Sequence, residues 1–178
     1  MENTNLNYML SRLGRISVHP WFISALNLCF FFILFNSVLD IFLTHASPYK
    51  EAEDIIEGVG VILIAWGVAL EERNKLREVF GLLHQDGSDN ALYEAALDEN
   101  CHRYGLGLLL LGLFSEVGVE CVRIPDRIID TTSIENNVLL ASACLQVVAG
   151  ALMLRHVAYL LFISKKSVVS SAVKGKSN

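Results

Sequence analysis

The sequence predicts an all-α membrane protein whose four transmembrane helices form an antiparallel bundle. The 178-residue chain is 53% hydrophobic and only 19% charged, a composition that soluble domains rarely have. Its apolar residues gather in blocks close to the roughly 17–25 residues that a helix needs to cross a bilayer. Each block also has one face of small and polar residues, as expected of helices that pack together in a membrane. The four blocks span about 21–44, 55–70, 104–122 and 138–163.

The first block is too long for the apolar core of a cleaved signal peptide, which has about 7–15 residues. We therefore expect a retained span. Pro20 precedes the block and suits a first helical turn, because the missing N–H of proline would be unpaired there. The polar face of this helix carries Cys29, Asn36 and Asp40.

The second and third blocks can span a membrane only if it accommodates the carboxylates in or beside them. One face of the second block carries Glu53, Glu57, Gly60, Gly67 and Glu71. One face of the third carries Gly105, Gly112, Glu116 and Glu120. Between these blocks, helical stripes on both sides of a turn-rich segment predict a helical hairpin over about 71–103, outside the membrane. We expect residues 1–178 to form a single membrane domain.

The fourth block carries Ser142, Gln146, Ala149 and His156 on one face. Lysines and arginines favour one side of the four spans. The N-terminus, the hairpin and the C-terminus together hold ten, the other two loops hold three, and Arg155 lies inside a span. The positive-inside rule therefore places both termini and the hairpin in the cytoplasm, at the inner (plasma) membrane.

In this topology four carboxylates lie toward the outer ends of their helices and converge at one level. They are Asp40, Glu57, Glu116 and Glu120. A charge at mid-membrane costs about 2.5–3.5 kcal/mol on insertion scales, and neighbouring carboxylates repel one another. Some of them must therefore be protonated, paired with arginine or bound to a cation. We predict a cation- or proton-binding site. Two alternatives remain open: the carboxylates pair with Arg123 and Arg127 or lie in outer-leaflet water, or they form a polar contact between subunits of a larger complex.

The inner half of the fourth block contains an arginine next to a histidine. Arg155 lies roughly 12 Å inside the block, counted from Ile163 by the helical rise, and we expect it to form an ion pair with Glu71. Arg155 and His156 point about 100° apart on a helix. The sequence therefore leaves open which of the two faces the bundle axis.

These features predict a small integral membrane protein that handles a cation or protons. Because four helices seldom enclose a wide pore, we expect a homo-oligomer or a part of a larger membrane complex. Two alternatives remain open: a non-catalytic accessory or assembly subunit, and a metal- or haem-binding redox protein that uses His19, His102 or His156.

Several function classes are disfavoured by what the sequence lacks. It contains no Walker motif, G-x-S-x-G, H-E-x-x-H or dinucleotide fingerprint, which disfavours an enzyme. The net charge of −5 disfavours a nucleic-acid partner. The pattern specifies neither an ion nor a cofactor.

Overall fold

The computed structural model describes residues 12, 14–43, 49–80, 82, 88–126 and 132–162. Every regular element within those ranges is an α-helix, so the all-α prediction is confirmed. A short helix, α4 (Arg73–Val79), follows α3. The long helices are α2 (Pro20–Leu43), α3 (Tyr49–Glu71), α5 (Ser88–Asp126) and α6 (Thr132–Phe162).

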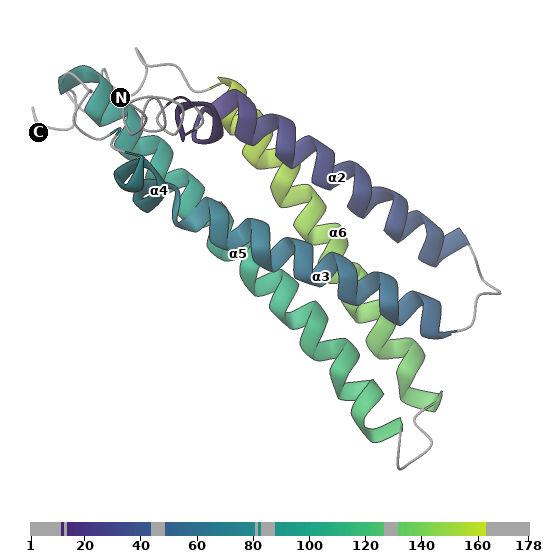
Figure 1. The fold of residues 1–178 in the computed structure, drawn as a ribbon. Coiled ribbons are helices and arrows are strands. Elements are labelled where there is room, and N and C mark those ends of the chain that lie inside the picture. The colour runs from purple at the N-terminus through teal and green to yellow at the C-terminus, as the bar shows by residue number, and fades with distance from the viewer. Residues whose placement is uncertain are drawn as a thin grey trace, which may run out of the picture.

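The long helices run side by side and alternate in direction along the chain (Figure 1). Helix α3 packs mainly on α5, and α2 packs mainly on α6. Helix α6 contacts all three of the other long helices. The C-terminal ends of α2 and α5 and the N-terminal ends of α3 and α6 lie toward the same end of the molecule (Figure 1).

Three helices are long and apolar enough to cross a membrane, as expected of a multi-pass membrane protein. The apolar stretches are Pro20–Ile41 in α2, Ala91–Ile124 in α5 and Asn137–Phe162 in α6. They coincide with the first, third and fourth blocks of the sequence. In the described part of the chain, α3 is not among these helices. It carries carboxylates near both of its ends, and a fourth span there stays a prediction.

Buried apolar side chains form two clusters at different levels of the helices. The larger cluster includes Leu34, Leu63, Leu108 and Met153. The smaller one, nearer the loop between α5 and α6, consists of Ile56, Val119 and Leu139. On α5 the buried positions recur every three or four residues, which is the seam that packed helices bury. These positions are Tyr93, Leu97, Cys101, Gly105, Leu108, Gly112, Ser115, Val119 and Val122.

Glycines bring α3 and α5 together at backbone distance. A Cβ atom on Gly67 would lie 2.7 Å from the carbonyl oxygen of Gly105, and a Cβ atom on Gly112 would lie 2.7 Å from the carbonyl oxygen of Gly60. Small residues allow such close helix contacts. Helix α3 therefore lies directly along α5 over at least the two turns between Gly60 and Gly67.

Candidate functional site

Arg123, near the end of α5, gathers three carboxylates around its guanidinium. Its Nη1 donates to Glu57 Oε2 at 2.7 Å and to Glu120 Oε1 at 3.2 Å, and its Nη2 donates to Asp54 Oδ1 at 3.0 Å. The arginine side chain is 29% exposed. One positive charge thus faces three negative charges. We call these four residues the Arg123 cluster.

Glu116 lies one helical turn deeper on α5 than Glu120. Its Oε2 atom is buried and has no hydrogen-bond partner among the residues that the structure describes. Gly60 makes room for this carboxyl group, because a Cβ atom there would lie 3.0 Å from Glu116 Oε2. A buried carboxylate oxygen without a donor is costly. Glu116 is therefore suited to carry a proton or to face a cation.

The structure brings together three of the four carboxylates expected to form the site. Glu57 and Glu120 share Arg123, and Glu116 lies within electrostatic range of both. Asp40 is exposed on α2, a helix that packs mainly on α6. The pairing with Arg123 is present, whereas Arg127 lies outside the described residues.

A metal centre built from at least three His, Cys, Asp or Glu side chains is not found within the described ranges. This observation concerns clusters of those residue types alone. Hydroxyl and amide oxygens are a separate set of ligands, and they occur next to Glu116.

Two further polar side chains are fully buried in this part of the bundle, Ser115 on α5 and Gln146 on α6. Ser115 Oγ and Gln146 Oε1 both lack a hydrogen-bond partner in the described part of the chain. Gln146 Nε2 donates to the backbone carbonyl oxygen of Ile56 at 3.0 Å. The amide group of Gln146 is thereby oriented, and its oxygen is the atom left to bind something else.

The register of the helices places these groups at one level. A Cβ atom on Gly118 would lie 2.5 Å from Ser142 Oγ, so α5 faces α6 there. Because the two helices are antiparallel, Ser115 on α5 and Gln146 on α6 both lie about one turn further from the connecting loop. Gln146 also contacts Ile56 of α3. Ile56 lies one helical turn before Gly60, the glycine that faces Glu116.

We call Ser115, Glu116, Ser142 and Gln146 the polar layer. Apolar side chains of both clusters flank it along the bundle: Ile56 and Val119 toward the C-terminal end of α5, and Leu63 and Leu108 on the other side. The polar layer is thus enclosed by apolar side chains along the bundle, and it opens toward the Arg123 cluster through Glu116.

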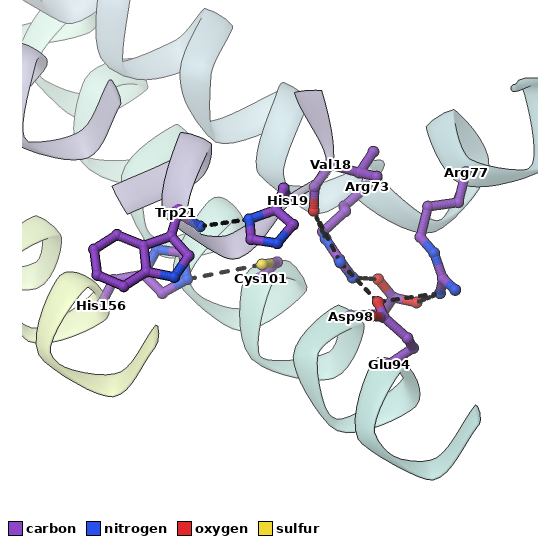
Figure 2. Close-up of polar contacts among 9 residues, drawn as sticks. All are labelled: Val18, His19, Trp21, Arg73, Arg77, Glu94, Asp98, Cys101 and His156. Carbon is purple, nitrogen blue, oxygen red and sulfur yellow. Dashed lines mark hydrogen bonds and ion pairs between the residues drawn. The ribbon is translucent and has the colours of Figure 1, made fainter. Parts of the chain in front are cut away.

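A second buried polar group links all four long helices. Trp66 Nε1 donates to Asn27 Oδ1 at 2.8 Å, and Asn27 Nδ2 lies 3.1 Å from His156 Nδ1. Tryptophan can only donate, so the Asn27 amide must present its NH₂ group to the histidine. His156 Nδ1 is therefore an acceptor, and the neutral ring carries its proton on Nε2. That atom faces Cys101 Sγ at 3.7 Å (Figure 2), and Tyr104 stacks on the imidazole ring at 4.6 Å.

This arrangement answers which of the two neighbouring residues on α6 faces inward. His156 is fully buried, whereas Arg155 is exposed. Glu71 lies beside His102, with 3.8 Å between Oε1 and Nδ1. Over the ranges that the structure describes, the expected ion pair between Arg155 and Glu71 is not present.

The same hydrogen bonds bear on the metal- or haem-binding alternative. With its proton on Nε2 and its Nδ1 accepting from Asn27, His156 has no nitrogen lone pair left for a metal. Ligation would require breaking the bond to Asn27. His19 is exposed and accepts a hydrogen bond from the backbone N–H of Trp21 at 3.3 Å (Figure 2). His102 is also exposed.

At the opposite end of the molecule from Arg123, two arginines of α4 meet two carboxylates of α5 (Figure 2). Arg73 donates from Nη2 to Glu94 at 2.8 Å, from Nη1 to Asp98, and from Nε and Nη2 to the carbonyl oxygen of Val18 at 3.1 and 3.0 Å. Arg77 Nη1 donates to Asp98 at 2.8 Å. We call the two arginines and the two carboxylates the Arg73 cluster.

The charges of the Arg73 cluster balance. Arg73 is only 3% exposed. Burial lowers the pKa of its guanidinium, but the charges of Asp98 and Glu94 outweigh burial and raise the pKa above its ordinary value. Arg73 therefore stays charged, and the cluster ties α4 and the segment before α2 to α5.

The residue spacing of the sequence contains a signal for the Arg73 cluster. Arg73 and Arg77 are four residues apart, and so are Glu94 and Asp98. Each pair lies on one face of a helix, on either side of the predicted turn.

No protein-family description, curated protein or solved structure matches the chain. The proposed function therefore rests on the side chains described above.

Proposed function

We propose that the protein handles protons or a cation through Glu116, as a small multi-pass membrane protein. The observation that carries the proposal is the buried Glu116 oxygen, which has no hydrogen-bond partner in the described residues, beside a cluster with excess negative charge. A carboxyl group in that position is stable when it holds a proton or a cation. Ionisable side chains within membrane spans are rare and costly, and they mark ion or proton pathways.

In this proposal α3 is a fourth span. Helix α3 lies along α5 at backbone distance, and α5 is long and apolar enough to cross a membrane. The carboxylates of α3 then lie near the two membrane surfaces: Asp54 and Glu57 at one, and Glu71 at the other, followed by Glu72 at the start of α4. The four spans form an antiparallel bundle with both termini on one side.

The distribution of positive residues makes that side the cytoplasm. Helix α4 and the first turns of α5 are then the cytoplasmic hairpin, and the Arg123 cluster faces the outer surface of the inner (plasma) membrane. A single bundle of four helices has no wide pore, so the protein acts as a homo-oligomer or moves its ion through a narrow, occluded route.

The Arg123 cluster forms the entrance in this mechanism. Its excess negative charge attracts cations to the outer surface. Glu120 is four residues from Glu116 on the same face of α5, which is about 6 Å along the helix axis. A proton or cation that reaches Glu120 from water can pass to Glu116, while Arg123 limits the repulsion among the other carboxylates.

Flux measurements in liposomes test this function. We expect the purified protein to dissipate a pH gradient, as read from an enclosed pH-sensitive dye, and Glu116→Gln to reduce the rate to that of empty liposomes. The matched control is Glu99→Gln, because Glu99 is an exposed carboxylate on the same helix at the other end of the molecule. Equal flux in the wild type and Glu116→Gln would overturn the proposal.

A second candidate function is that of an accessory or assembly subunit. An open groove of about 730 Å³ lies between α4 and the first turns of α5, next to the Arg73 cluster. Charged side chains of both signs line it, including Glu72, Lys75 and Glu99. If docking is the function, the purified chain carries no flux. The double substitution Glu72→Lys and Glu99→Lys then lowers the apparent mass of its complex on native gels.

A further inference from the structure

Besides the Glu116 carboxylate, the polar layer contains buried oxygen atoms of a serine and a glutamine. Ser115 and Gln146 are fully buried, and each has an oxygen without a hydrogen-bond partner across the described ranges. A buried polar atom in a native protein ordinarily has a partner, and an exception calls for a bound water or ion. Two such oxygens occur at the level of a third, Glu116 Oε2.

The chemistry of the three atoms selects the kind of ligand. Gln146 presents its amide oxygen, because its NH₂ group is used by the carbonyl oxygen of Ile56. A hydroxyl oxygen from Ser115 and a carboxylate oxygen from Glu116 complete the set. All three can accept or coordinate, and all are hard oxygen ligands, which suit hard cations. The negative charge of Glu116 would repel an anion, and a soft metal would find no sulfur ligand among these three atoms.

The charge of the polar layer indicates the charge of the cation that it binds. Within the polar layer, Glu116 is the one residue with an ionisable side chain. A buried charge must be closely balanced. One carboxylate balances one positive charge, and the excess negative charge of the Arg123 cluster lies outside the layer, on side chains that are 34–74% exposed and screened by water. The apolar clusters on either side keep the ion from bulk water.

We infer that the polar layer binds a monovalent metal cation of the sodium type, held by Glu116, Ser115 and Gln146 in place of the proton on Glu116. This inference rests on the proposed function and names its ion. The exchange is balanced. One cation enters, the O–H bond of the Glu116 carboxyl group breaks, one proton leaves to water, and the net charge of the layer does not change.

Two measurements on the purified protein in detergent test the inference. The first is thermal unfolding in NaCl against choline chloride at equal ionic strength, since a ligand that binds the folded state raises the unfolding temperature. The second is proton release on adding NaCl to weakly buffered protein, read with a pH dye. We expect NaCl but not choline chloride to stabilise the protein, with release of about one proton per chain, because one carboxyl group exchanges.

Substitution of Ser115 by alanine separates an ion site from packing. If the layer binds sodium, Ser115→Ala loses one ligand, and the sodium affinity falls by about tenfold or more. If the layer is only structural, removing a hydroxyl group without a partner leaves the protein as stable or more stable. The control is Ser37→Ala on α2, because Ser37 Oγ bonds the carbonyl oxygen of Ile33 in its own helix. It should keep the full sodium response.

The outcomes distinguish the inference from the function on which it rests. Proton flux that needs Glu116, without a sodium effect on unfolding or proton release, keeps the proposed function and overturns the sodium site. A sodium response that Ser115→Ala leaves intact places the ion elsewhere and also overturns the site. A sodium response lost in both Ser115→Ala and Glu116→Gln, without any flux, supports the site and overturns the transport function.

Discussion

Arg73 and Arg123 occupy opposite ends of the same molecule, and each binds two carboxylates of another helix. Arg73 is almost completely buried and donates to two carboxylates and one backbone carbonyl. Together with Arg77 it meets an equal number of negative charges. Arg123 is partly exposed and meets three carboxylates alone. One end is charge-balanced, and the other has excess negative charge.

The difference shows how a structural ion cluster can be told from a candidate ion site. A balanced, buried cluster with its donors engaged gains nothing from an added ion, and it serves to hold helices together. A cluster with excess carboxylate charge, next to buried oxygens that have no partner in the described residues, gains from a proton or cation. Charge balance separates the two ends better than the number of charged residues does.

Arg73→Ala should have the largest effect on stability. It would leave Glu94 and Asp98 close together and largely buried with only Arg77 to balance them, and it would remove both bonds to the carbonyl oxygen of Val18. Removing one partner of a buried ion pair costs about 3–5 kcal/mol. We expect the free energy of unfolding, measured by SDS titration in mixed micelles, to fall by about that amount.

A second substitution checks the cause of that loss. Adding Asp98→Ala to Arg73→Ala removes the uncompensated charge, so the double variant should recover part of the lost stability. If the single variant unfolds at the same SDS fraction as the wild type, the Arg73 cluster does not hold the helices together. A structural role would then not distinguish it from the Arg123 cluster.

The two ends also differ in how far the sequence predicted them. Apolar periodicity predicted the helices, because helix formation and membrane length are local properties. The approach of Glu57, Glu116 and Glu120 followed from their faces and direction alone. Asp40, in contrast, lies on an exposed face of α2. The rotation of a helix in a bundle depends on its contacts with other helices, so the sequence of α2 alone did not predict this.

Features that depend on two or more helices were harder to predict. His156 faces inward because Asn27 and Trp66 orient its ring, and neither partner is near it in sequence. The polar layer depends on the register between α5 and α6, which the contact of Gly118 with Ser142 fixes. The sequence placed Gln146 on a polar face, but it could not show that Ser115 lies at the same level.

Arg123→Ala should have a smaller effect on stability and a clear effect on function. Because the side chain is partly exposed, its carboxylate partners retain contact with water when it is removed. Their unbalanced charge should then bind cations more strongly, so proton flux should become more sensitive to added salt. Liposome flux at several NaCl concentrations measures this change, with Arg123→Lys as the control that retains the charge. A salt dependence equal to that of the wild type would mean that Arg123 does not regulate the entrance.

Arg103→Ala should have the smallest effect and sets the baseline for the other two. Arg103 bonds Glu99 at 2.7 Å on the same helix, but its side chain is 74% exposed. Exposed pairs four residues apart on a helix contribute about 0.3–0.5 kcal/mol, because water screens the charges and two flexible side chains must be ordered. The SDS titration should show a loss of that size, and flux should not change. A loss as large as that of Arg73→Ala would mean that burial and charge balance do not explain the difference between the two ends of the molecule.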